Sequence, residues 1–180
     1  MTTRLALLGS INIGGNRMKM ADLRERLAAD GFDRVETVAA SGNVILSSDE
    51  SEVDLAARIA TVIEREFGIV GFVVVRTLAD VRSAIDDNPF HGDGADKMVH
   101  TIFLPREPDE GGFEALLQAH RDRGAERLAL DDRVLYLDYV HGVGMSDLTG
   151  RFIEKRLGCR GTARNMTSLK RILAKMEEFA

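Results

Sequence analysis

An order of strands and helices that occurs twice along the chain constrains the fold more than any other feature. In the first half, a helical periodicity through Met20, Leu23 and Leu27 and another from Leu55 to Phe67 alternate with strand-like apolar runs. The predicted strands cover residues 4–9, 35–39, 44–48 and 70–76. This β-α-β-β-α-β order is the split βαβ pattern of ferredoxin-like domains.

The second half repeats the order. Strands are predicted at 98–104, 127–130 and 134–140, with a short one within 158–165, and helices near 113–120 and from Ser146 or Asp147 onward. A last helix follows, with Thr167 as its predicted cap. We therefore predict an α+β protein of two ferredoxin-like (βαββαβ) subdomains packed as one unit, with an additional C-terminal helix. The predicted subdomains are residues 1–76 and 77–180, joined by a helix over 77–88.

Local signals predict several details of these elements. Ser51 and Thr77 stand where helix N-caps are expected. The sequence Ser41-Gly42-Asn43 has the chemistry of a hairpin turn, because Gly and Asn tolerate positive φ. The spacing of Phe113, Leu116, Leu117 and His120 predicts one buried helical face.

The charge is unevenly distributed. The whole chain carries a formal net charge of −5, which argues against coating nucleic acid with the entire surface. Residues 151–175 nevertheless contain eight arginines and lysines and one acid, Glu154. This basic segment indicates either an anion-binding site or cations that only solvate the outer faces of two helices.

A glycine-rich loop between the first strand and the first helix is one candidate binding element. Backbone amides of such a loop, next to a helix N-terminus, can hold an anion. The loop matches neither the P-loop nor the Rossmann fingerprint. The alternative is a tight turn with exposed cations. The candidate binding residues here are Asn12, Gly14, Gly15, Asn16 and Lys19.

Two further segments carry candidate binding residues. Ser41 and Asn43 flank the glycine of the first hairpin, where a plain turn is the alternative. Thr162, Arg164 and Asn165 precede the last helix, and a hydroxyl, a guanidinium and an amide could together clamp a phosphate or carboxylate. The alternative is a helix-entry turn in which Asn165 or Thr167 caps the last helix and Arg164 forms a salt bridge.

Catalytic and metal-binding patterns are weak. His120 is expected in the core, and His141, at the start of a glycine loop, is the best candidate for acid–base chemistry. No histidine or acid has metal-ligand spacing, so neither a metal nor a cofactor is predicted. Cys159 is the only cysteine, which excludes an intramolecular disulfide. The sequence has neither a membrane span nor a targeting segment, so a cytoplasmic protein is expected.

Five segments of the sequence resemble the DUF1697 family of bacterial proteins. They are RLALLGSINIGGNRMKMADLRERLAADGF, VETVAASGNVILSS, FVVVRTLADVRSAIDDNPF, GVGMS and TARN. The family pattern near the start is usually Leu-Arg-Gly-Ile-Asn-Val-Gly-Gly, and this chain lacks that arginine, having Gly9 and Ser10 after Leu8. The resemblance implies an α+β fold with two ferredoxin-like subdomains, and it implies no catalytic residues.

These observations lead to a functional hypothesis and two alternatives. The first is a protein that binds a small anionic, phosphate-bearing ligand where the three polar segments converge. The second is a non-catalytic module that binds nucleic acid or protein through the basic segment 151–175. The third is a self-associating protein without a small ligand. The sequence decides neither catalysis nor oligomeric state.

Overall fold

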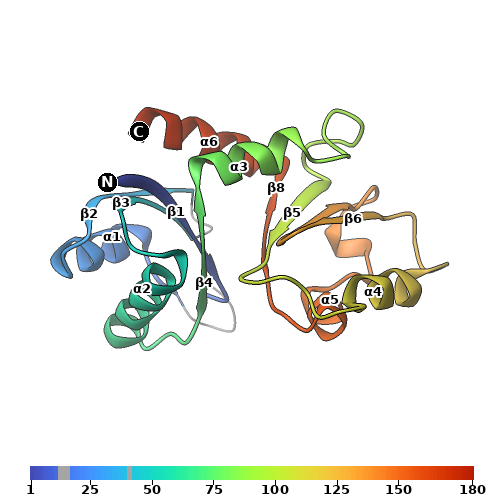
Figure 1. Ribbon diagram of the computed structural model, residues 1–180, viewed down its shortest axis with the longest axis horizontal. Helices are drawn as coiled ribbons and strands as arrows, with labels where there is room; N and C mark the ends of the chain where they lie inside the picture. The colour runs from blue at the N-terminus through green and yellow to red at the C-terminus, as the bar shows by residue number, and fades with distance from the viewer. Residues whose placement is uncertain (12–16, 40–41) are drawn as a thin grey trace. The chain divides into compact units, whose positions relative to one another are not determined.

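The chain folds into two compact units, which the computed structural model describes at residues 1–11, 17–39 and 42–180 (Figure 1). Unit 1 comprises Met1–Arg82 and Arg171–Ala180, and unit 2 comprises Ser83–Lys170. The described residues form two four-stranded antiparallel sheets and six α-helices. The protein therefore has a mixed α+β fold, as the sequence predicts.

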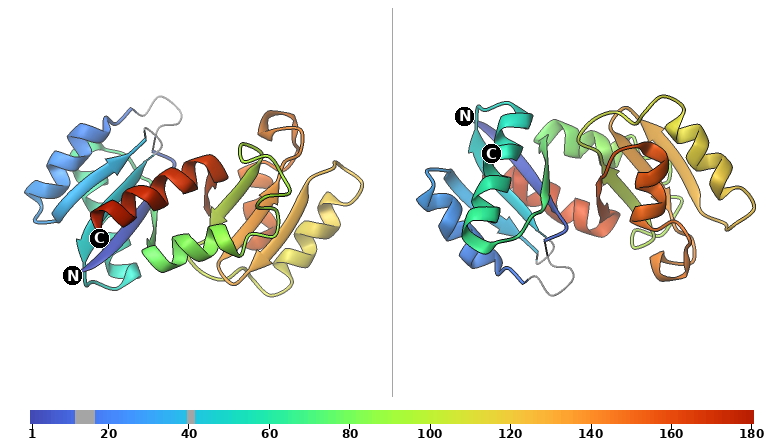
Figure 2. Two further views of the ribbon diagram at one scale, coloured as in Figure 1. Left: turned by 90° about the horizontal axis from the view of Figure 1, so that it is seen from above. Right: turned by 90° about the horizontal axis from the view of Figure 1, so that it is seen from below.

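Unit 1 contains the first sheet, with the strand order β2-β3-β1-β4. Helices α1 and α2 cover one face of this sheet (Figures 1 and 2). Because side chains alternate along a strand, Ala6 and Leu8 of β1 point into the core beneath these helices. The elements are β1 (Thr2–Gly9), α1 (Met20–Ala29), β2 (Asp33–Val38), β3 (Asn43–Ser48), α2 (Glu52–Phe67) and β4 (Phe72–Thr77).

The last ten residues of the chain belong to unit 1 and pack at its sheet. Arg34 of β2 donates a hydrogen bond to the carbonyl of Phe179 at 2.6 Å, and its guanidinium lies 4.3 Å from the centre of the Phe179 ring. Lys175 forms an ion pair with Glu36 at 3.0 Å. The C-terminal end of helix α6 (Met166–Phe179) is thus attached to strand β2.

Unit 2 repeats the architecture with the strand order β6-β7-β5-β8. Helices α4 and α5 lie side by side on one face of its sheet (Figures 1 and 2), above a core that includes Leu104, Leu116 and Leu137. The elements are β5 (Val99–Phe103), α4 (Gly112–His120), β6 (Arg127–Asp131), β7 (Val134–Asp138), the 3₁₀ turn η1 (Val143–Met145), α5 (Gly150–Leu157) and β8 (Thr162–Asn165).

One helix follows the fourth strand of each sheet: α3 (Leu78–Asp86) follows β4, and α6 follows β8. The boundaries between the two units fall within these helices. The predicted division after residue 76 and the packing of the halves as one unit stay predictions.

Helix caps show where local sequence signals hold and where they fail. Ser51 and Thr77 both accept a hydrogen bond from the backbone NH three residues later, as expected for N-caps. The prediction for Thr167 is wrong, because Asn165 Oδ1 accepts the NH of Ser168 at 2.9 Å. Helix α5 begins at Gly150, capped by Thr149, rather than at Ser146 or Asp147.

The buried face of α4 is narrower than its apolar spacing predicts. Leu116 and His120 are buried, but Leu117 is 40% exposed. The prediction for Leu117 is wrong: Leu117 lies about 100° from Leu116 around the helix, at the margin of the face that packs on the sheet. No helix of the described residues combines the length and apolarity that crossing a membrane requires.

Candidate functional site

Only part of the predicted binding set lies within the described residues. Asn12, Gly14, Gly15, Asn16 and Ser41 lie outside them. Lys19 is exposed at the N-cap position of α1 and makes no side-chain capping bond. Lys19 therefore presents its charge to solvent beside a helix N-terminus.

Asn43 has a clear structural contact. It is fully buried at the start of β3, and its amide donates a hydrogen bond to the carbonyl of Val38 at 2.9 Å. Because buried amides must be hydrogen-bonded, this contact stabilises the β2–β3 hairpin. The assignment of Asn43 to a binding site stays a prediction.

Thr162, Arg164 and Asn165 lie in strand β8, the short strand predicted within residues 158–165. Arg164 is 7% exposed, and its Nη1 donates to the Thr162 hydroxyl at 2.8 Å and to the Ala163 carbonyl at 2.7 Å. Burial lowers the pKa of Arg164 to about 10, which still leaves the guanidinium charged at neutral pH. The structure thus places a fixed positive charge beside a hydroxyl, next to the N-terminus of α6.

An equivalent arginine occurs in unit 1. Arg76 is the second-last residue of β4, as Arg164 is of β8, and it is 3% exposed. Arg76 Nη1 donates to the carbonyl of the preceding residue at 2.8 Å, in the same manner as Arg164. In each unit the next residue, Thr77 or Asn165, caps the following helix. The two strand ends are therefore local copies of one another.

The surroundings of the two arginines differ in polarity. The sheet registers pair Arg76 with Leu5 and Arg164 with Thr101. Three buried neighbours of each arginine, on its own strand or across the sheet, differ in kind: they are aliphatic in unit 1 and carry hydroxyls in unit 2. The equivalent positions in the two units are Leu5 and Thr101, Ile45 and Tyr136, and Val74 and Thr162. We call Arg164, Thr101, Tyr136 and Thr162 the polar cluster.

The members of the polar cluster are deeply buried. Thr101 is fully buried, Tyr136 is 3% exposed and Thr162 is 5% exposed. Burial, followed by the charges of Asp131 and Asp87, raises the pKa of Tyr136 to about 12, so its hydroxyl stays protonated and can donate a hydrogen bond. Buried polar side chains on a sheet face are costly, which makes this cluster a candidate functional site.

A second group of buried polar side chains lies between α4 and β6. Glu126 lies 3.3 Å from His120 Nε2, and both side chains are more than 90% buried. Within the described residues, both ring nitrogens of His120 and Glu126 Oε2 lack a well-aligned hydrogen bond. Sequence reasoning placed His120 in the core correctly but did not identify Glu126, which precedes β6 without any recognisable motif.

The charge of Glu126 makes stability depend on pH. Burial opposes its ionisation, but a hydrogen bond with Ser146, its own backbone, and the charges of His120 and His141 outweigh burial and lower its pKa. A group with a depressed folded pKa stabilises the fold above its unfolded pKa, about 4.3, and loses that contribution as pH falls through the folded value.

We therefore expect the Glu126→Gln variant to be less stable than the wild type at pH 7. The difference should narrow as pH falls below about 4, where the wild-type carboxyl takes up a proton. Urea unfolding of both proteins between pH 3 and pH 7 measures this convergence. A constant difference across that range would contradict the prediction.

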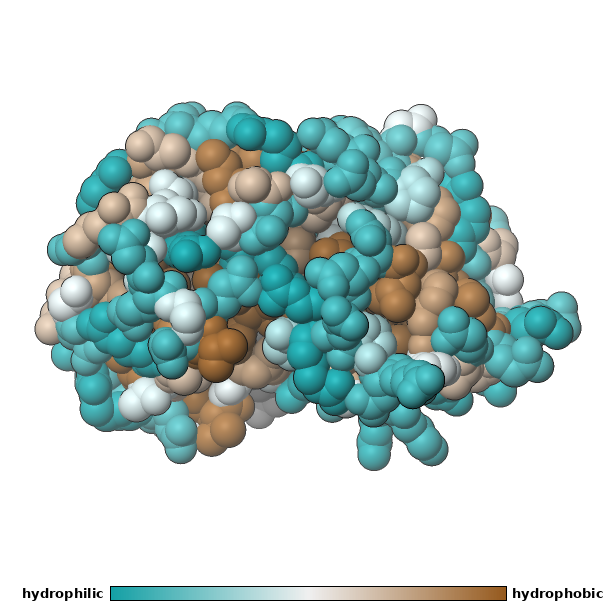
Figure 3. All heavy atoms as spheres, in the orientation of Figure 1, coloured by the Kyte–Doolittle hydropathy of each residue, from teal (hydrophilic) through white to brown (hydrophobic). Residues whose placement is uncertain are grey.

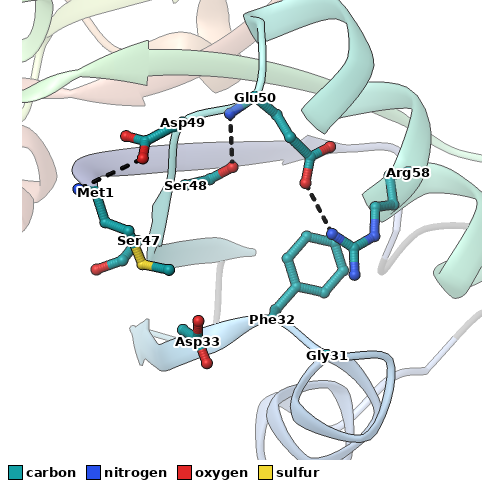
Figure 4. A pocket seen from close by; sticks show the side chains of 9 residues that line it. All are labelled: Met1, Gly31, Phe32, Asp33, Ser47, Ser48, Asp49, Glu50 and Arg58. Carbon is teal, nitrogen blue, oxygen red and sulfur yellow. Dashed lines mark hydrogen bonds and ion pairs between the residues drawn. The ribbon is translucent and has the colours of Figure 1, made fainter.

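A pocket of about 440 Å³ in unit 1 has the wrong charge for an anion (Figure 4). Asp33, Asp49 and Glu50 line it together with Arg58. Arg58 already donates to Glu50 at 2.7 Å and to the Asp30 carbonyl at 2.6 Å, and its guanidinium lies 3.9 Å from the Phe32 ring centre. The pocket therefore suits a cationic group better than a phosphate.

The described residues give little support for a metal site or a thiol nucleophile. No three His, Cys, Asp or Glu side chains there gather closely enough to hold a metal ion. Burial raises the pKa of the Cys159 thiol, which disfavours the nucleophilic thiolate. His141 is exposed in the loop after β7, and its role in acid–base chemistry stays a prediction.

These features define a small α+β protein whose two units repeat one strand order, with a buried polar cluster in the second. A family model described as "Protein of unknown function (DUF1697)" matches residues 1–136. The chain belongs to the DUF1697 family, as its sequence motifs indicate.

A solved structure with a similar fold comes from Streptococcus pneumoniae, the conserved bacterial protein SP0830. It has a TM-score of 0.76 and 20% sequence identity, and the alignment covers 98% of this chain and 99% of that chain. At this identity the similarity shows the fold alone. A comparison with curated proteins found no match.

Proposed function

We propose that this protein binds a small anionic, phosphate-bearing ligand at the polar cluster of unit 2. One observation carries the proposal: around equivalent buried arginines, unit 1 has three aliphatic side chains and unit 2 has three hydroxyls. A core optimised for stability alone would favour the aliphatic set, because buried hydroxyls are costly to desolvate even where they have partners, as Thr162 has in Arg164 and Thr101 has in Asn88. The polar set has a reason if it serves a ligand.

The chemistry of the cluster suits an oxyanion. A guanidinium offers several donors in a planar fork that matches phosphate and carboxylate oxygens. The hydroxyls of Thr101, Tyr136 and Thr162 supply further donors. Burial of Arg164 strengthens its attraction for an anion, because charges interact more strongly in a low-dielectric environment than in water.

The polar segments predicted from the sequence extend this proposal only in part. Asn165, the residue after Arg164, is included in this proposal. The candidate binding residues of unit 1, which are Lys19, Asn43, Ser41 and the glycine-rich segment 12–16, stay a separate prediction of anion binding. The identical strand order in the two units also supports a ferredoxin-like arrangement of each sheet with its helices. The division after residue 76 stays a prediction.

Thermal unfolding with phosphate, sulfate and a set of nucleotides tests the proposal. At about 100 times its Kd, one of these anions should add about 2.7 kcal/mol to the stability of the wild type. Arg164→Lys should lose most of this gain because lysine lacks the fork. Thr101→Val, which removes a hydroxyl at nearly constant volume, should weaken it.

Arg76→Lys is the matched control, since it makes the same change at the equivalent position of unit 1. It should keep the full response to anions. If no anion stabilises the wild type, or if Arg76→Lys loses the response as Arg164→Lys does, the proposal fails. Lys19→Gln tests the separate prediction for the glycine-rich segment of unit 1.

A further inference from the structure

A group of cations on unit 2 has no acidic partners within the described residues. Elsewhere many exposed cations are neutralised by nearby acids, as in the ion pairs of Arg82 with Glu177 and of Lys170 with Asp96. Four cations in or against α5 form no such ion pair among the described residues. We call them the α5 basic surface: Arg123, Arg151, Lys155 and Arg156.

The centre of this surface is an aromatic ring with two guanidinium groups. Phe152 is half-buried, and the guanidinium carbons of Arg156 and Arg123 lie 3.4 Å and 5.7 Å from its ring centre. Arg156 also donates to the Phe152 carbonyl at 2.9 Å, which fixes its position. Two like charges are therefore held close to one ring, an arrangement that a bound anion would stabilise.

The remaining cations extend the surface along one side of α5. Arg151 and Lys155 are exposed and four residues apart, so they lie on the same side of the helix. Asp122 and Glu154 are nearby in sequence but form no ion pair with these cations among the described residues. In Figure 3, hydrophilic side chains project below the position that α5 has in Figure 1.

We propose that the α5 basic surface binds single-stranded nucleic acid. Proteins that bind single strands combine cations that follow the phosphates with aromatic or arginine planes on which bases stack. The surface offers both within one short helix and its neighbouring turn. The net charge of −5 on the whole chain repels a long duplex, so a short contact with one strand fits better. This inference does not rest on the small-anion site at Arg164.

Binding should be weak at physiological salt and strongly salt-dependent. If about four cations contact phosphates, the logarithm of the association constant should fall with the logarithm of salt concentration with a slope of about −3, at roughly 0.7 per contact. Fluorescence anisotropy of labelled 12-nucleotide DNA and RNA strands, from about 50 to 200 mM salt, measures this slope.

Variants locate the contact. The double variant Arg151→Gln with Lys155→Gln should reduce the magnitude of the slope by about 1.4, that is, two contacts of 0.7 each. Phe152→Leu should weaken binding about tenfold, because it removes the ring that positions the Arg156 guanidinium as a stacking plane. Lys97→Gln is the matched control, because Lys97 is an exposed cation of unit 2 that forms no ion pair among the described residues and lies outside α5.

Several results would overturn the inference. They are the absence of binding at about 50 mM salt, an equal loss in Lys97→Gln, tighter binding of duplex DNA, or tighter binding of an acidic peptide. Arg164→Lys should leave strand binding unchanged, and the α5 variants should leave the thermal response to small anions unchanged. The proposed anion site and the proposed nucleic-acid surface can therefore be refuted independently of one another.

Discussion

Replacing Phe103 with alanine should lower the free energy of unfolding of unit 2 by about 3–5 kcal/mol. Phe103 is fully buried in β5, the strand that pairs with both β7 and β8. Truncation removes apolar contacts and leaves a cavity that the paired strands cannot close by moving inward. Both tyrosines of the chain, Tyr136 and Tyr139, lie in unit 2, and tryptophan is absent. Tyrosine fluorescence during urea unfolding therefore reports on this unit.

Phe113→Ala provides the comparison. Phe113 of α4 is only partly buried against the core of unit 2, so the same truncation should cost clearly less. An equal loss of unfolding free energy in the two variants would contradict the expectation that the fully buried Phe103 contributes more to stability than the partly buried Phe113. A loss below about 1 kcal/mol for Phe103→Ala would contradict its burial.

The second large effect is expected at a hairpin glycine. Gly42 has φ +75°, and an added Cβ would lie 2.6 Å from Ile11 Cδ1 and 3.1 Å from Leu8 Cβ. Its carbonyl also accepts the NH of Leu8 at 2.8 Å, so the turn cannot move freely away from β1. Gly42→Val should destabilise unit 1 by about 2–5 kcal/mol, from a left-handed backbone cost of about 1–2 and an overpacking cost of about 1–3.

Gly68→Val separates these two costs. Gly68 follows α2 with φ +66°, but no heavy atom would lie within 4 Å of its Cβ. This variant should therefore lose only the backbone part, about 1–2 kcal/mol. Chemical unfolding followed by far-UV circular dichroism measures both variants. If Gly68→Val were as unstable as Gly42→Val, steric crowding at the hairpin would have no measurable effect.

The sequence predicted the order of elements in this fold because each element carries its own local signal. Alternating strands, a long apolar stripe in α2 and the caps at Ser51 and Thr77 all depend on residues close together in the chain. The errors arose where two local signals compete. Thr149 rather than Ser146 or Asp147 caps α5, and Asn165 rather than Thr167 caps α6, because tertiary contacts decide among neighbouring residues that can each cap a helix.

The candidate site was less predictable. Arg164 and Thr162 are two residues apart in a strand, so the sequence could find them together. Thr101 and Tyr136 join them only through the pairing of β5 with β8 and β7, and no local pattern encodes that register. The equivalence of Arg164 with Arg76 likewise requires both registers to be known.

Unit 1 consists of two segments that are far apart in the sequence, and this affects when it can be completed during synthesis. Its final segment, Arg171–Ala180, leaves the ribosome only after all of unit 2 has been made. Until then, Arg34 and Glu36 of β2 lack the partners that Phe179 and Lys175 supply. Unit 2 is continuous in sequence and has no such delay. The half of the protein that is translated first is therefore the last to acquire its complete set of native contacts.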